Sequence, residues 1–267
     1  PRTKDRSSEG YKLLGREGSG FGLAGRATKF VGRQHELELL HSRFASVSRG
    51  RGQFVGIAGE PGMGKSRLLF EFVQALTGTP VTYIEARCHS YGTRVPFLPV
   101  LQMLQGFCRW TDTDTPVTIK QKLRRSLEDL GMEAEEATPY LLQIVGIKDG
   151  AEGLADVSSS VVQARTFEIL RVIALESSRR RPLVLAVEDV HWIDPTSEAY
   201  MASLAESLAG APILLVATYR SGYRPTWLDK SYATQVALQP LAPGDSLTIV
   251  EAVLGPDRAI DDVAEGI

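Results

Sequence analysis

The sequence predicts a three-layer α/β fold in which helices cover both faces of a mostly parallel sheet. Short apolar runs have the length expected of buried strands, at residues 53–58, 81–86, 183–187 and 213–218. Stretches with apolar residues at helical spacing separate these runs, and that alternation is typical of a parallel sheet. A glycine-rich turn joins the first run to the helical pattern that follows it.

The first 28 residues are rich in Gly, Ser, Arg and Lys and show no sustained period. We therefore expect residues 1–28 to be a linker or the junction with an upstream domain. Since the chain begins with Pro1 rather than Met, we expect it to be a piece of a longer protein. After Phe30, apolar residues at Leu37, Leu40 and Phe44 predict an amphipathic helix.

The helices that follow are predicted by the same spacing. Residues 68–76 mark a helix behind the glycine-rich turn, and residues 96–175 are mostly helical, with breaks expected near Pro116, near Pro139 and at residues 150–160. Between the last two apolar runs, helical spacing of apolar residues continues from Tyr200 to Leu208. A final helix is predicted from Leu247, Val250, Val253 and Leu254.

Composition excludes several classes of function. With 30 basic and 32 acidic residues the formal net charge is −2, so no overall field favours nucleic acid or an anionic membrane. Cys88 and Cys108 have no CxxC spacing and no neighbouring His cluster, which argues against zinc and a disulfide framework. No apolar run approaches the roughly 20 residues that span a bilayer. A reducing cytoplasm is the expected location.

The glycine-rich turn matches G-x-x-x-x-G-K-[ST] at every fixed position, with Gly59, Gly64, Lys65 and Ser66. In such a phosphate-binding loop (P-loop), backbone N–H groups surround the β-phosphate, the lysine reaches the β- and γ-phosphates, and the hydroxyl ligates magnesium. We therefore expect ATP with Mg²⁺ here. The expected nucleotide-binding residues are Gly59, Glu60, Pro61, Gly62, Met63, Gly64, Lys65, Ser66 and the adjacent Arg67.

Two further strand ends carry polar residues. The run at 183–187 ends in Glu188 and Asp189, which are expected to hold magnesium with Ser66 and to orient the attacking water. Side chains alternate along a strand, so the two carboxylates take different roles unless the strand ends between them. The run at 213–218 leads to Arg220, which can approach a γ-phosphate if this strand lies beside the P-loop strand; the other interpretation is a surface arginine.

His191 and Trp192 follow the acidic pair directly, and we interpret this histidine as a packing residue. The other histidines form no pair at metal-ligand spacing, and Cys88 has no histidine positioned to favour a thiolate. The sequence contains no G-x-S-x-G motif.

Four segments together resemble the predicted ATPase domains of the STAND class, relatives of the AAA+ proteins. The segments are residues 30–37 (FVGRQHEL), 59–66 (GEPGMGKS), 188–194 (EDVHWID) and 217–220 (ATYR). The sequence is most similar to the ATPase module found after class III adenylate or guanylate cyclase domains, and similar modules occur in LuxR-type regulators. The resemblance covers the chain from about Phe30 to its end.

The resemblance implies roles that the residues alone do not give. It places Val31, Gly32 and Arg33 near the adenine, and it makes Glu188 and Asp189 the Walker B pair and Arg220 a γ-phosphate sensor. Many members of the wider class have Asp where this chain has Glu188, so which of the two carboxylates activates water stays open.

The domain organisation expected from these patterns has three parts. A P-loop NTPase core of the AAA+-like type occupies residues 29–241 after the linker, and the beginning of a small helical lid occupies residues 242–267. The resemblance implies a slowly hydrolysing ATP switch that self-associates when ATP-bound and is covalently linked to sensor and effector domains. Two alternatives stay open: a nucleotide-binding scaffold that does not hydrolyse ATP, and a small-molecule kinase.

Overall fold

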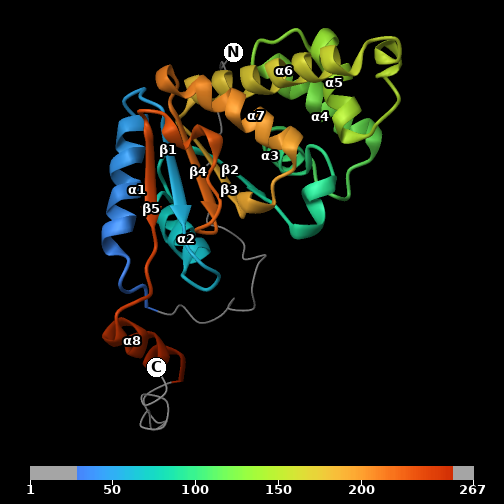
Figure 1. Cartoon of the computed structure of the whole chain (residues 1–267). Coiled ribbons are helices and arrows are strands. Elements are labelled where there is room, and N and C mark those ends of the chain that lie inside the picture. The colour runs from blue at the N-terminus through green and yellow to red at the C-terminus, as the bar shows by residue number, and fades with distance from the viewer. Residues whose placement is uncertain (1–28, 255–267) are drawn as a thin grey trace.

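The computed structural model describes residues 29–254 and shows, within them, a five-stranded sheet with helices on both faces (Figure 1). The strands are β1 (Gln53–Ala58), β2 (Thr82–Arg87), β3 (Leu183–Glu188), β4 (Ile213–Tyr219) and β5 (Ala233–Ala237). Their order is β2-β3-β4-β1-β5, and every neighbouring pair is parallel. The predicted three-layer α/β class is confirmed.

The described helices are α1 (Gln34–Val47), α2 (Lys65–Ala75), α3 (Leu98–Cys108), α4 (Pro116–Asp129), α5 (Ala134–Val145), α6 (Ser159–Arg180), α7 (Pro195–Glu206) and α8 (Pro243–Leu254). Short 3₁₀ turns connect them: η1 (Ser90–Arg94), η2 (Glu152–Leu154), η3 (Val190–Trp192), η4 (Leu208–Gly210) and η5 (Thr226–Asp229). The predicted linker at residues 1–28 and the end of the predicted lid lie outside the described residues.

Two hydrophobic cores sandwich the sheet. On one face, α1 and α2 pack residues such as Leu40 and Phe72 against Val55 and Val216. On the other face, α3, α6 and α7 pack against the alternate side chains of the same strands. Every residue of β3 and β4 is buried, because central strands covered on both faces need continuous apolar runs.

The layer formed by α4, α5 and α6 extends beyond the edge strand β2, and α8 lies apart from the sheet (Figure 1). Pro116 starts α4 at its first turn, with the Thr115 hydroxyl accepting from the Thr118 N–H. The break expected near Pro139 was wrong, because this proline lies inside α5. Strand β5 was not expected from the sequence.

Candidate functional site

The P-loop runs from the end of β1 to the start of α2, as the sequence predicted. Gly62 and Gly64 have φ angles of 84° and 85°, which L side chains rarely adopt, so glycine is required at both positions. The Gly59 N–H donates to the Tyr219 carbonyl at 3.1 Å, which fixes the loop to β4. The N-terminus of α2 therefore opens toward the loop, where its N–H groups can receive an anion.

Lys65 is 9% exposed and lies folded back on its own loop. Its Nζ donates to the carbonyls of Gly59 at 2.7 Å and Glu60 at 3.0 Å. Burial lowers the pKa of Lys65, while the nearby charges of Asp189 and Glu60 raise it. The ammonium group thus has neutral acceptors that a phosphate oxygen can replace.

Ser66 of the P-loop contacts Glu188, the acidic residue at the end of β3, directly. Its hydroxyl donates a hydrogen bond to Oε2 of Glu188, whose side chain is completely buried. Strand β4 lies between the P-loop strand β1 and the acidic strand β3, so the contact spans an intervening strand. The carboxyl ends of parallel strands share one edge of the sheet, which explains why the residues still meet.

The strand ends between the two carboxylates. Glu188 is the last residue of β3, and Asp189 adopts a left-handed conformation with φ of 58°. The Asp189 N–H donates to Oγ1 of Thr218 at 3.0 Å, which holds this uncommon backbone geometry. The Asp189 side chain is 35% exposed, whereas Glu188 is fully buried, so the two acids differ in access to solvent.

Arg87 joins both carboxylates and was not identified from the sequence. Its guanidinium lies 3.3 Å from Glu188 and 3.8 Å from Asp189. Thr218 was likewise missed as a supporting residue. Both occupy the carboxyl ends of strands, β2 and β4, and this position in a parallel sheet is the signal that could have identified them.

Arg220 follows β4, and β4 is hydrogen-bonded to β1, so the condition for its approach to the loop holds. Its guanidinium lies 5.6 Å from the centre of the Trp192 ring. Its positive charge contributes to lowering the pKa of Lys65, an effect smaller than that of burial. The side chain is exposed, so it can reorient.

His191 packs on Trp192 with ring centroids 5.1 Å apart, which agrees with a packing role. Both of its ring nitrogens are buried, however, and within residues 29–254 neither has a hydrogen-bond partner. Burial lowers the pKa of His191, and Asp189, Arg220 and Lys65 are its charged neighbours. Burial thus favours the neutral form of this imidazole, whose charged neighbours all belong to the candidate site.

Residues 31–33 lie at the junction of the core with α8. Arg33 is buried, donates to the Gln239 carbonyl and contacts Glu36 at 3.2 Å. Gly32 has φ of 69°, and a Cβ there would lie 2.6 Å from Oδ2 of Asp245 on α8. This position connects the start of α1 to the first turn of the expected lid.

The side chain of Arg67 turns along α2 rather than into the loop. It pairs with Glu71 at 2.6 Å and lies 5.9 Å from the centre of the Phe70 ring. Its contribution to nucleotide binding would therefore come from the backbone N–H in the first turn of α2.

The oxygen ligands at these strand ends suit magnesium bound together with a nucleoside triphosphate. The Ser66 hydroxyl and the Glu188 and Asp189 carboxylates are hard oxygen ligands, and Mg²⁺ typically takes one or two carboxylates together with substrate phosphates. Within the described residues no group of three or more His, Cys, Asp or Glu side chains could hold a metal ion alone. In the same part of the chain, no helix is both long and apolar enough to cross a bilayer.

Comparison with known proteins gives a family and a fold. The sequence model described as an AAA ATPase domain matches residues 29–216, a range that stops before Arg220. An uncharacterized protein of Rhizobium meliloti (strain 1021) is 31% identical over 236 residues, which are 83% of this chain and 21% of that protein. The chain thus spans about a fifth of the length of this curated relative.

Two solved structures are similar in fold. The Drosophila ORC bound to DNA aligns over 100% of this chain and 60% of its own, with 13% identity and a TM-score of 0.54. A STAND protein with a tetratricopeptide repeat sensor from Pyrococcus horikoshii aligns over 90% of this chain and 28% of its own, with 15% identity and a TM-score of 0.43.

Proposed function

The chain belongs to the AAA ATPase domain family, and from this premise we propose that it binds ATP with magnesium at residues 59–66 and hydrolyses it slowly as a regulatory switch. The observation that carries the proposal is the contact of the P-loop Ser66 with the buried Glu188. A hydroxyl and a carboxylate from distant segments meet at the start of α2, where a triphosphate would lie.

The geometry supports separate tasks for the site residues. Lys65 would exchange its two carbonyl partners for the β- and γ-phosphates. Ser66 and the buried Glu188 would hold magnesium, Glu188 through water, and the ion when bound neutralises charge on the phosphates. Asp189, the more exposed acid, would accept a proton from the attacking water. The water oxygen forms a bond to the γ-phosphorus while the bond from that phosphorus to the bridging oxygen breaks, which gives ADP and phosphate.

The switch would depend on groups that distinguish ATP from ADP. Arg220 follows β4, its guanidinium lies over the Trp192 ring and its side chain is exposed, so a γ-phosphate could draw it inward. At the other side, Val31, Gly32 and Arg33 would contact the adenine while touching the segment that leads into α8. Nucleotide exchange would then alter how α8 sits on the core.

The wider role rests on the resemblance described from the sequence. We propose that sensor and effector domains lie elsewhere in the same protein, for which a cyclase or a transcriptional regulator domain is the expected kind. ATP-bound copies would associate with one another in the cytoplasm. We expect this domain itself to contact neither nucleic acid nor membrane, given its near-neutral charge.

Single-turnover kinetics separate this function from its alternatives. The chain is mixed in excess with γ-labelled ATP and magnesium, and labelled phosphate is followed with and without small-molecule acceptors. Slow release of inorganic phosphate supports the switch. Binding without release identifies a scaffold, and label transferred to an acceptor identifies a kinase.

A further inference from the structure

His191 carries an imidazole that packing alone does not explain. It lies in η3, two residues after Asp189, and the residue as a whole is partly exposed. Both of its ring nitrogens are nevertheless buried, and within residues 29–254 neither has a hydrogen-bond partner. Buried polar atoms are almost always hydrogen-bonded, so such a group calls for an explanation. A phenylalanine ring could pack on Trp192 with no polar atom to bury.

Hydrogen bonds on both sides of His191 fix the backbone that carries it. On one side, the Asp189 N–H donates to Oγ1 of Thr218 at 3.0 Å, and the Asp189 carbonyl accepts from the Trp192 N–H at 2.9 Å. On the other side, the buried Asp194 caps the N-terminus of α7 with its carboxylate. Because the backbone is held, a hydrogen-bond partner for the imidazole has to lie within reach of its side-chain rotation.

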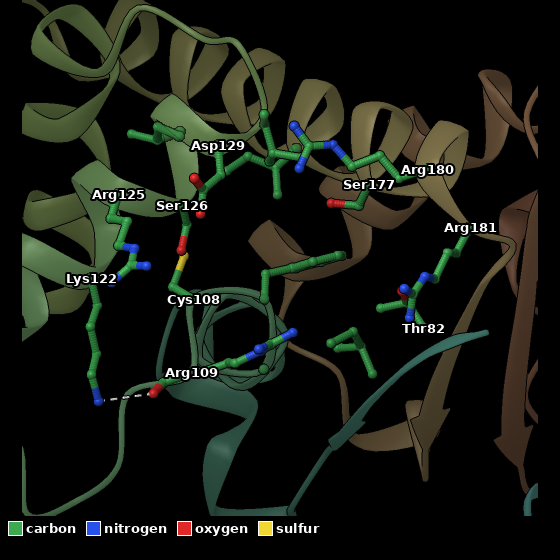
Figure 2. Close-up of a pocket in the computed structure, with 16 residues that line it drawn as sticks. Thr82, Cys108, Arg109, Lys122, Arg125, Ser126, Asp129, Ser177, Arg180 and Arg181 are labelled. Carbon is green, nitrogen blue, oxygen red and sulfur yellow. Dashed lines mark hydrogen bonds between the residues drawn. The ribbon is translucent and has the colours of Figure 1, made fainter. Parts of the chain in front are cut away.

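The surroundings of the imidazole indicate which site it serves. Its charged neighbours are Asp189, Arg220 and Lys65, which all belong to the candidate nucleotide site. The cavity that Figure 2 shows, between β2 and the helices α3, α4 and α6, lies elsewhere. Thr82 lines that cavity at the beginning of β2, whereas Asp189 follows the carboxyl end of β3, which runs parallel to β2. The partner is therefore to be sought at the nucleotide site.

Building on the proposed function, we propose that His191 orients the attacking water in the hydrolysis of ATP. A neutral imidazole, the form that burial favours here, has one nitrogen that accepts a hydrogen bond. The water donates one hydrogen to Asp189 and the other to this nitrogen, which points an oxygen lone pair at the γ-phosphorus. Asp189 takes its hydrogen as a proton, and the second hydrogen stays on the oxygen that enters the phosphate. His191 acts by orientation and forms no covalent bond.

A turn of the side chain brings the nitrogen to the water. Both nitrogens are covered in the described conformation, where the imidazole packs on Trp192 with ring centroids 5.1 Å apart. The Arg220 guanidinium lies over the same indole ring, 5.6 Å from its centre. Movement of Arg220 toward a γ-phosphate thus changes the packing of the ring on which His191 rests. The hydrogen bond gained by a nitrogen that was buried without a partner favours the turn.

Single-turnover hydrolysis by the full chain tests this role with three variants. His191→Phe keeps a ring against Trp192 and removes the acceptor, so phosphate release should slow by at least about tenfold while the affinity for a non-hydrolysable ATP analogue stays within about twofold. His191→Gln restores an acceptor oxygen and should release phosphate faster than His191→Phe. His41→Phe is the matched control, because His41 is also partly buried and packs on an aromatic ring, that of Phe72. Its rate should equal that of the wild type.

Two further measurements do not depend on turnover. His191→Phe removes two buried nitrogens that have no partner in the described residues, so its melting temperature without nucleotide should equal or exceed that of the wild type. In chain labelled with ¹⁵N at its four histidines, the ring signals of His191 should shift when the ATP analogue and Mg²⁺ are added, but not with ADP. The spectrum of His191→Phe identifies those signals.

The outcomes separate this inference from the proposed function. A wild-type rate in folded His191→Phe, or ring signals that do not respond to the analogue, would overturn the role of His191 and leave the ATPase in place. So would a loss of analogue affinity as large as the loss of rate, or His191→Gln no faster than His191→Phe. If the wild-type chain itself releases no phosphate, the proposed function fails and the role of His191 falls with it.

Discussion

At the residue scale, the candidate site depends on three strand ends that bring Arg87, Glu188 and Thr218 together. Arg87 contacts both acids, and Thr218 holds the backbone of Asp189 in its left-handed turn. These contacts orient the carboxylates without nucleotide. In the proposed ATP site the acids would be in position before the nucleotide binds, which would lower the cost of ordering them.

Changing either acid should separate binding from hydrolysis. We expect Glu188→Gln and Asp189→Asn to retain ATP, because the P-loop that grips the phosphates is unchanged, and at least one of them to slow phosphate release by about 100-fold or more. Phosphate release and nucleotide affinity are measured for each variant. Asp149→Asn, at an exposed ion pair with Lys120, is the control. If both variants hydrolyse ATP at the wild-type rate, Glu188 and Asp189 have a structural role only.

Arg220 should affect ATP more than ADP. A guanidinium that meets only the γ-phosphate adds differential affinity, and only differential affinity shifts a two-state equilibrium. Arg220→Ala should weaken a non-hydrolysable ATP analogue by about 1–3 kcal/mol relative to ADP. Calorimetry with both nucleotides measures this difference. If Arg220→Ala lowers the affinity for both nucleotides equally, or for neither, Arg220 is a surface residue that contacts Trp192 and senses no γ-phosphate.

At the element scale, the buried strands could be predicted and the edge strand β5 could not. β1, β3 and β4 have continuous apolar runs because both of their faces are covered. β5 has one buried residue, Val236, so its sequence carries almost no strand signal, and its pairing with β1 is set by tertiary contact.

The site itself was predictable where one segment contains the motif. Residues 59–66 and the pair 188–189 could be found because fixed spacing or adjacency reveals them. No local motif reveals Arg87, because its partners are about a hundred residues away; its place at a strand end was the available signal, and the strand order decides which ends meet. At Pro139 a local signal was misleading in the opposite way. The proline predicted a helix break, but it lies inside α5, where packing of the helix overrides that preference.

The turn before β1 offers a test of packing at this scale. A Cβ on Gly52 would lie 1.9 Å from the Leu208 carbonyl oxygen and 2.7 Å from that of Ala211. Because these are backbone atoms, Gly52→Ala should destabilise the fold by at least about 2 kcal/mol in urea unfolding. Gly210→Ala, where nothing lies within 4 Å of the new Cβ, is the neighbouring control. Equal stability of the two variants would show that the turn can shift.

At the scale of the whole molecule, the segment at residues 31–33 joins the core to the region of α8 by direct contacts. Gly32 has a positive φ angle and leaves space for Asp245 and Leu241. This arrangement links the proposed adenine contacts to the first turn of α8. A change at the proposed adenine contacts could thus reach α8 directly.

Gly32→Ala should loosen α8 without unfolding the core. The added methyl group would overlap the Asp245 side chain, so amide hydrogen exchange in residues 243–254 should speed up by at least about fivefold. Exchange in β3 and β4 should not change. Gly153→Ala, with open space around its Cβ, is the control. Unchanged exchange in α8 would show that this junction does not hold the helix.

The proposed function depends above all on the binding of ATP by residues 59–66 through Lys65. Titration of the chain with a fluorescent ATP analogue and magnesium measures it directly, with Lys65→Ala as the variant and Lys120→Ala as the control. Lys65 is buried in the loop, whereas Lys120 pairs with the exposed Asp149. We expect saturable binding to the wild type and the control, and loss of measurable binding in Lys65→Ala with an unchanged circular dichroism spectrum. Wild-type affinity in a folded Lys65→Ala variant would contradict the proposed function.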